Sequence, residues 1–162
     1  MDNNNFNELD LVEFNDNHIL LLKEWLEKEY IKKWFQKPED WMNEIRLRET
    51  DYAFIHHYIV LDGINPIGFC QYYKCVDADE EDYRAFPKIG TYSIDYLIGD
   101  ENYLGKGIGK KIISLLKDLV FKLSDSKLIV VKPDKENIQS CKVLEKNGFN
   151  YDEVNMVYYI NK

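Results

Sequence analysis

The sequence predicts an α/β (α+β) fold built on a mixed, partly parallel, twisted sheet. The 12 Tyr, 8 Phe and 3 Trp in 162 residues favour a strand-rich fold over a helical bundle. Strand-like and helix-like segments alternate through the second half of the chain, as they do where helices cover a parallel sheet. The length is that of about one domain with a full core. We therefore expect residues 1–162 to form a single domain.

The chain opens with a strand followed by two helices. Weak alternation of apolar and polar residues predicts a strand over Leu9–Phe14. Apolar residues at helical spacing predict a helix over His18–Phe35, which side chains of Asn15–Asn17 can cap. Pro38 in a first helical position, with acidic residues behind it, predicts a second helix through about Arg48.

Three strands and an acidic loop come next. Ala53–Leu61 and Ile67–Val76 are rich in β-branched and aromatic residues, and Asp62–Gly63 between them is a hairpin signal. Asp77–Asp82 is an acidic loop, and Thr91–Ile98 is predicted to be the next strand.

The second half alternates between helix and strand. An amphipathic helix is predicted over Gly107–Leu123, and a short apolar strand over Leu128–Val131. A helix over Asn137–Asn147 then precedes two closing strands, Phe149–Val154 and Met156–Ile160. The predicted order is β-α-α-β-β-β-α-β-α-β-β.

Composition and charge exclude several classes of protein. With 21 basic and 29 acidic residues the net charge is −8, and the pI is near 4.9. No dense basic face is available for nucleic acid. No apolar run is long enough to cross a membrane. An acidic chain favours a small cationic substrate or partner, although the same charge also serves solubility alone.

Cysteine and histidine patterns predict a reduced protein without a metal. The 3 Cys form no CxxC pair, which predicts free thiols and a cytoplasmic location. The 3 His show no metal-ligand spacing. The polar, acidic first ten residues do not resemble a signal peptide. We expect a monomer or a homodimer.

A glycine-rich loop carries the strongest chemical signal. Gly105, Gly107 and Gly109 lie where the loop after Thr91–Ile98 becomes a helix. Glycine lets a ligand approach the backbone, and the first N–H groups of a helix have no partners within it. With the helix dipole they form a site suited to phosphate, though a tight flexible turn would look the same. The spacing matches neither the dinucleotide fingerprint nor a Walker A loop.

This loop resembles the signature of the GNAT superfamily of acetyl-CoA-dependent N-acetyltransferases, Gln/Arg-x-x-Gly-x-Gly/Ala. Leu104–Gly109 matches both glycines, with Leu104 at the leading position. A second family motif, Asn-x-x-Ala/Ser-x-x-x-Tyr-x-Lys-x-Gly-Phe, follows the next strand and carries Leu144 at the Tyr position. The residues that match the second motif are Asn137, Ser140, Lys146, Gly148 and Phe149.

The resemblance implies that acetyl-CoA is the co-substrate and that no metal is needed. Its pyrophosphate would lie on the amides of the glycine loop, and its pantetheine arm between Thr91–Ile98 and Leu128–Val131. The residues that the resemblance assigns to acetyl-CoA are Leu97, Ile98, Leu104, Gly105, Lys106, Gly107, Ile108, Gly109, Lys110 and Asn137.

Within the superfamily the chain is most similar to the aminoglycoside 6′-N-acetyltransferases. Pro66–Tyr73 is similar to their IG-aromatic-x-Q-x-Y strand. Tyr92–Gly99 is similar to their strand before the CoA loop, with Ser93 and Tyr96 replacing Gly and Gln. The resemblance implies acetyl transfer to the 6′-amine of an aminoglycoside. Related branches act on siderophore precursors or protein N-termini.

Asp95 is the candidate catalytic base. Asp is disfavoured inside strands, so its place in Thr91–Ile98 indicates a solvent-facing residue, a bulge or a functional group. Acetyl transfer needs a neutral amine, and a carboxylate can bind the ammonium and accept its proton. In the aminoglycoside enzymes an Asp at the matching position is assigned this role. Leu144 cannot act as the general acid, so another Tyr, a water or an unprotonated thiolate must serve.

The remaining candidates concern the acceptor. The acidic loop, and Asp79 and Asp82 within it, would attract a polycation, or would simply be solvated. Trp34, near the turn between the first two helices, would form a wall of the acceptor site or pack in the core. Gln71 in the preceding strand is the last predicted acceptor contact.

Three functions remain open from the sequence. The first is an aminoglycoside 6′-N-acetyltransferase, which Asp95 and the acidic loop favour. The second is an acetyltransferase that acts on a polyamine, a siderophore amine or a protein N-terminus. The third is a non-catalytic acyl-CoA-binding module, which Leu104 and Leu144 favour.

Overall fold

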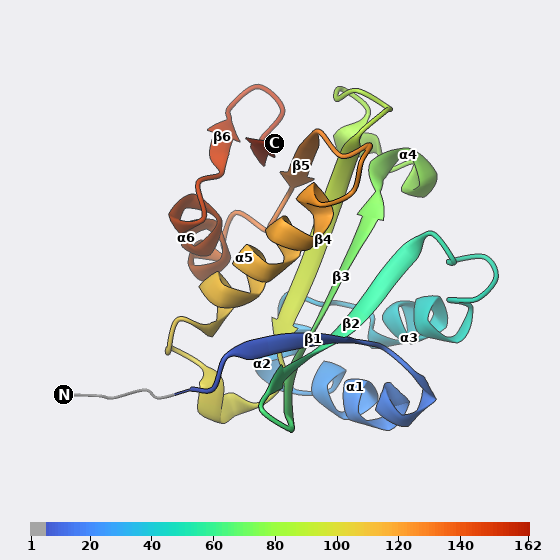
Figure 1. Cartoon of the computed structure of the whole chain (residues 1–162), viewed down its shortest axis with the longest axis vertical. Coiled ribbons are helices and arrows are strands. Elements are labelled where there is room, and N and C mark those ends of the chain that lie inside the picture. The colour runs from blue at the N-terminus through green and yellow to red at the C-terminus, as the bar shows by residue number, and fades with distance from the viewer. Residues whose placement is uncertain (1–5) are drawn as a thin grey trace.

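Seven strands form one sheet in the order β1-β2-β3-β4-β5-β7-β6 (Figure 1). The structure is a computed structural model that describes residues 6–162; residues 1–5, part of the polar N-terminal segment, lie outside the described residues. Only β4 and β5 pair in parallel among the described strands, so the predicted mixed, partly parallel sheet is confirmed. The strands are β1 (Leu9–Glu13), β2 (Ile55–Asp62), β3 (Asn65–Lys74), β4 (Thr91–Ile98), β5 (Leu128–Val131), β6 (Asn150–Asp152) and β7 (Val157–Asn161).

Helices cover both faces of this sheet (Figure 1). The α-helices are α1 (Ile19–Leu26), α2 (Glu29–Lys32), α3 (Pro38–Arg46), α4 (Cys75–Ala78), α5 (Ile108–Phe121) and α6 (Ile138–Lys146). Short 3₁₀ turns are η1 (Asp16–His18), η2 (Glu81–Tyr83) and η3 (Glu101–Tyr103). The apolar sides of α1–α3 pack on one face, and α5 with α6 packs on the other.

Strand alternation decides which side chains of β4 meet which helices. Ile94 belongs to the core under α5, and Leu97 belongs to the core under α1–α3. Successive residues of a strand point to opposite faces. Asp95, two residues before Leu97, therefore lies on the α1–α3 face of the sheet.

The helix predicted over His18–Phe35 is divided in the structure. Lys28 has an extended backbone, with φ −68° and ψ 133°, and separates α1 from α2. The Lys28 ammonium donates to the carbonyl of Gly99 at 2.8 Å, across the end of β4. The periodicity of this segment was compatible with one helix, but contacts to a distant strand interrupt it.

The acidic loop is also more structured than predicted. β3 ends at Lys74, so that Cys75–Ala78 forms α4 instead of continuing the strand. Asp79 then adopts the left-handed conformation, with φ 48°. This turn reverses the chain and brings Glu80 back toward β3.

Candidate active site

A cleft of about 370 Å³ lies among α2, α3, the ends of β4 and β5, and α6. Its lining runs from the face covered by α1–α3 to the start of α6. Residues predicted for acetyl-CoA or the acceptor that line this cleft are Trp34, Asp95, Leu97, Ile98, Leu104 and Asn137.

The floor of the cleft is the gap between two diverging strands. β4 and β5 pair in register only at Thr91–Leu128 and Tyr92–Ile129. From Ser93 to Ile98, β4 has no partner strand on its β5 side among the described residues. Its backbone groups there are available to an extended ligand, since a buried N–H or C=O requires a hydrogen-bond partner.

The glycine loop leads directly into α5. Gly105 and Gly107 have φ values of 71° and 76°, which a residue with a side chain adopts only under strain. A Cβ built on either residue would meet nothing within 4 Å, so packing against the protein does not explain these glycines. Gly107 is the N-cap of α5 and offers no side-chain hydrogen bond, which leaves the first amides of the helix free.

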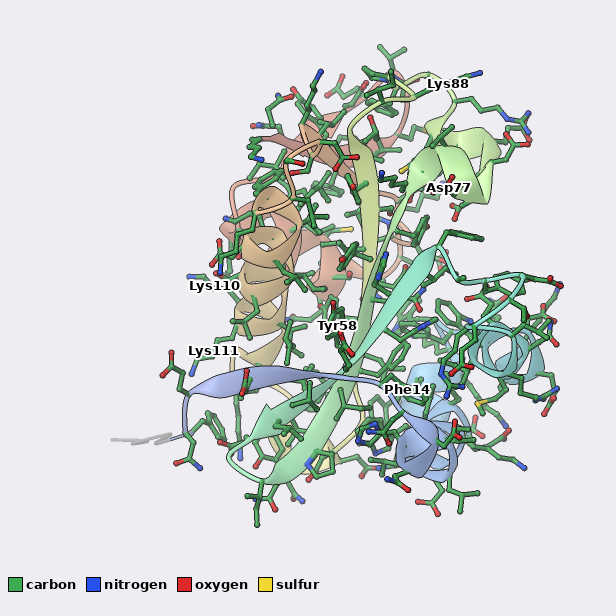
Figure 2. The ribbon with its side chains drawn as sticks, turned by 45° about the vertical axis from the view of Figure 1, so that its right-hand side comes forward. Phe14, Tyr58, Asp77, Lys88, Lys110 and Lys111 are labelled. Atoms are coloured by element: carbon green, nitrogen blue, oxygen red, sulfur yellow. The ribbon has the colours of Figure 1, made fainter. Side chains whose placement is uncertain are left out.

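Several lysines lie near the first residues of α5. The ammonium groups of Lys106 and Lys111 each lie 5.7 Å from the centroid of the Phe6 ring. Lys110 and Lys111 project from α5 away from the sheet (Figure 2). Of the other loop residues, Ile108 is buried in the core, so only its backbone can face a ligand. The loop combines free amides with positive charge, as an anion site requires.

Asp95 is half-buried and lines the cleft. Its Oδ2 accepts a hydrogen bond from Gln71 Nε2 at 2.9 Å. The pKa of the Asp95 carboxyl is raised to about 6, chiefly by burial; the Gln71 hydrogen bond acts to lower this pKa and the charge of Glu80 acts to raise it. A carboxylate of this pKa is ionised at neutral pH and is still basic enough to accept a proton from a bound amine.

Two further carboxylates share this region, and the sequence analysis named neither. Glu80 Oε1 accepts a hydrogen bond from the Tyr73 hydroxyl at 2.6 Å, which fixes it beside the strand face that carries Asp95. Glu44 on α3 is half-buried, and its pKa is raised to about 7 by burial, then by Asp95, Glu80 and Asp40. Across residues 6–162, no lysine, arginine or histidine forms an ion pair with Glu44, Glu80 or Asp95.

The two acidic residues that the sequence singled out have cationic neighbours. Asp79 Oδ1 lies 3.3 Å from Arg84 Nε. Asp82 Oδ1 lies 2.5 Å from Lys132 Nζ, on the far side of the loop after β5. Both carboxylates are exposed and stand outside the cleft lining. Their local charge is partly neutralised, so Glu80 is the acidic-loop residue that contributes most to the field at Asp95.

Aromatic and amide side chains complete the walls. Trp34 and Phe35 line the cleft from the turn after α2, and Trp41 lines it from α3. The Lys33 ammonium lies 4.7 Å from the centroid of the Trp34 ring. Asn137 caps α6 by accepting the amide of Ser140 at 3.2 Å. Gln71 is only 2% exposed and does not line the cleft.

Two further observations concern metal ligands and membrane-spanning helices. In the part of the chain that the structure describes, no three His, Cys, Asp or Glu side chains gather to hold a metal ion. None of its helices has the length and apolar character needed to span a membrane.

Comparisons with known proteins agree on one family. The model of the acetyltransferase (GNAT) domain matches residues 15–156. The aminoglycoside N(6′)-acetyltransferase type 1 of Klebsiella pneumoniae is 25% identical over 144 residues, which cover 83% of this chain and 70% of that protein. The spermine/spermidine N(1)-acetyltransferase of Bacillus subtilis strain 168 is 29% identical over 86 residues, 53% of each protein.

Solved structures show the same fold. The aminoglycoside acetyltransferase AAC(6′)-Ib in complex with coenzyme A has a TM-score of 0.79 at 22% identity, over 95% of both chains. The aminoglycoside N(6′)-acetyltransferase of Legionella pneumophila has a TM-score of 0.73 at 17% identity, over 96% of this chain and 92% of that one. With the family model matching most of its length, this chain belongs to the family of GNAT acetyltransferases.

Proposed function

We propose that this protein transfers the acetyl group of acetyl-CoA to a primary amine of a polycationic acceptor, and that the acceptor is an aminoglycoside acetylated on its 6′-amine. We place the reaction in the cytoplasm and assign it to residues 1–162 as one domain. Relatives that carry this activity in their names, and structural neighbours that hold coenzyme A or aminoglycosides, support the proposal.

The observation that carries the proposal is the unpaired negative charge at the cleft, where Asp95 lines the wall and Glu44 and Glu80 lie close enough to it to interact electrostatically. Asp95, Glu80 and Glu44 come from three separate elements and have no cationic partner among the described residues. Carboxylates held together in this way repel one another, and the elevated pKa values of Glu44 and Asp95 express that repulsion together with burial. A ligand with several ammonium groups relieves it, whereas a neutral or anionic acceptor would not.

The proposed chemistry follows from the geometry. The free amides at the start of α5 hold the pyrophosphate, and the unpaired stretch of β4 binds the pantetheine arm and directs the thioester toward Asp95. Asp95 binds the reactive ammonium and accepts its proton, so that the neutral amine attacks the thioester carbonyl. Leu144 lines the cleft where the family motif has Tyr and cannot donate a proton. The coenzyme A thiolate leaves readily without one, given a reference thiol pKa near 8.5.

A polyamine is the second candidate acceptor. The partial similarity to the Bacillus subtilis spermine/spermidine enzyme favours it, and the same three carboxylates suit it. A narrow, flexible polyamine needs fewer contacts from the aromatic wall than a ring-based aminoglycoside does. The two candidate acceptors are distinguished by the activity that the protein shows on each, and by how strongly that activity depends on Trp34.

The test is an acetylation assay on a panel of aminoglycosides, polyamines and peptides, with free thiol release as the readout. We expect aminoglycosides to give the highest kcat/KM, with acetylation at the 6′-amine identified by mass spectrometry and NMR. Asp95→Asn should lower kcat by roughly 10²-fold or more, with unchanged affinity for acetyl-CoA. Asp118→Asn, an exposed carboxylate on α5, is the matched control and should keep full activity. Full turnover by Asp95→Asn overturns the base assignment, and a panel without any polycationic acceptor overturns the acceptor class.

A further inference from the structure

Asp95 and Gln71 face each other across neighbouring strands. They are register partners in the antiparallel β3–β4 pair, on the face covered by α1–α3. Gln71 Nε2 donates to Asp95 Oδ2 at 2.9 Å, and among the described residues Gln71 is the one hydrogen-bond partner of this carboxylate. One buried amide therefore determines how the carboxylate is oriented.

Gln71 itself is out of reach of an acceptor. Its exposed fraction is 2%, whereas Asp95 is half-buried and lines the cleft. The acceptor contact expected from the sequence is therefore replaced by an indirect role. We propose that Gln71 is a positioning residue, which orients the Asp95 carboxylate and stabilises its charged form without touching the acceptor. This inference rests on the proposed function, in which Asp95 is the base.

The surroundings of Gln71 fix the direction of its amide. If the amide were turned over, its carbonyl oxygen would face the carboxylate and repel it. In the observed orientation the Gln71 carbonyl has no hydrogen-bond partner among the described residues, and neither has Nε2 of His57, its register partner on β2. Burial lowers the pKa of His57 to about 4, so this ring is neutral at pH 7 and does not compete for the carboxylate.

The titratable groups that interact with Asp95 oppose its ionisation or are neutral, and Lys132, the lysine that lines the same cleft, is paired with Asp82. Glu80 from the acidic loop and Glu44 from α3 are carboxylates. Tyr73 on β3, Tyr83 on η2 and Cys75 on α4 are acids whose pKa values burial raises, so they stay protonated. The Gln71 N–H is thus the one local group that favours the charged carboxylate. Without it, burial and repulsion act unopposed.

The experiment compares pH profiles of Gln71→Met, which keeps the length of the side chain and removes the donor. The acid limb of kcat/KM reports the free enzyme's base. We expect its midpoint to move up by about half a pH unit or more, with a lower plateau and unchanged acetyl-CoA affinity by calorimetry. A uniform loss of activity at the wild-type midpoint would mean that Gln71 only fills space, and would overturn the inference. If Gln71→Met does not fold, Gln71→Asn carries the same test, because its shorter amide cannot reach Asp95.

A length-swapped variant provides the rescue. Gln71→Asn combined with Asp95→Glu keeps the total length between the two strands and restores the hydrogen bond. We expect the midpoint to return toward wild type in the double variant and to stay shifted in Gln71→Asn alone. An equal shift in both would overturn the inference. Asp95→Asn in the same assay separates the two proposals: full turnover there defeats the proposed function, whereas an inactive Asp95→Asn beside a wild-type profile for Gln71→Met defeats only this inference.

Discussion

The hydroxyl of Tyr30 donates to the backbone carbonyl of Ile98 at 2.7 Å, and so ties α2 to the last residue of β4. The same hydroxyl lies 3.0 Å from the carbonyl of Gly99, which also accepts from Lys28. A Cβ on Gly99 would come within 2.0 Å of the Trp25 ring, so α1 packs directly on this backbone. These contacts fix α1 and α2, which lie beside the proposed acceptor site, to β4, the strand that carries Asp95.

Removal of the Tyr30 hydroxyl should loosen this connection. Tyr30→Phe keeps the ring and leaves the Ile98 carbonyl to water, while the Gly99 carbonyl keeps its hydrogen bond from Lys28. We therefore expect a loss of about 1 kcal/mol in the free energy of unfolding. Urea denaturation measures it. Tyr151→Phe, which removes the hydroxyl of an exposed ring, is the control and should be neutral. Equal stability of the two variants would show that the Tyr30 contact is not a net stabilising one.

The glycine loop can be tested with a matched pair of alanine variants. Gly107 and Gly148 both have positive φ, 76° and 86°, and a Cβ on either meets no close neighbour. Alanine should therefore cost each variant a similar amount, about 1 kcal/mol. Only Gly107→Ala should weaken the binding of acetyl-CoA, by roughly tenfold. Its strained φ and new Cβ would disturb the backbone amides to which we assign the pyrophosphate. Calorimetry checks the affinity, and an unchanged Kd would place the pyrophosphate elsewhere.

Glu44 should affect the binding of the acceptor and not the binding of acetyl-CoA. Glu44→Gln removes one carboxylate that interacts with Asp95 from beside the cleft, so KM for a polycationic aminoglycoside should rise several-fold. The effect should shrink in high salt, since ions screen charges over about 8 Å at physiological ionic strength. Glu39→Gln lies on the same helix in a surface pair with Arg46 and provides the control. A KM for acetyl-CoA that moved as much as that of the acceptor would contradict this assignment.

The same residue predicts how stability depends on pH. Because the pKa of Glu44 is raised to about 7, the folded chain holds a proton that the unfolded chain has lost. Between the unfolded value and pH 7 the contribution of Glu44 to the free energy of unfolding therefore falls as pH rises. Glu44→Gln should match wild type at pH 4 and exceed it at pH 8, by on the order of 1–2 kcal/mol. Parallel pH curves from urea denaturation of the two proteins would refute this.

Charge reversal in the acidic loop should have a weaker effect than a change at Glu80. Asp79 and Asp82 are exposed and already paired with Arg84 and Lys132. Asp79→Lys and Asp82→Lys should raise KM for a polycation in a salt-dependent way, through the long-range field alone. Glu80→Gln should raise it more, because Glu80 has no cationic partner among the described residues and interacts directly with Asp95. Steady-state kinetics in low and high salt decide whether the three variants follow this order.

The sequence identified candidate functional residues within single segments better than it identified the contacts between segments. Asp95 was recognisable because a carboxylate is out of place in a strand, and the glycine loop because its residues sit between a strand and a helix. Both signals are local. Glu44 has no local signal: it is one acidic residue on an amphipathic helix, and only the packing of α3 over the sheet brings it toward Asp95.

Two misjudged elements have the same cause. The break at Lys28 follows from hydrogen bonds to residues some seventy positions away, which no helical periodicity records. In the acidic loop, five carboxylates look alike in sequence, and the left-handed turn at Asp79 decides that Glu80 is the one directed at Tyr73. Nothing in the sequence around Gln71 indicates whether its face of the strand is covered. The helices packed on that face bury its side chain.

Because β4 and β5 diverge, part of β4 has no partner strand on its β5 side among the described residues of the ligand-free protein. On the proposed function, acetyl-CoA acts as the missing strand, so that the co-substrate contributes to folding as well as to chemistry. A ligand at a hundred times its Kd adds about 2.7 kcal/mol to stability. A cell rich in acetyl-CoA would then keep more of this protein folded and protected from proteolysis than a starved cell would. The lifetime of the enzyme would follow the supply of the metabolite it consumes.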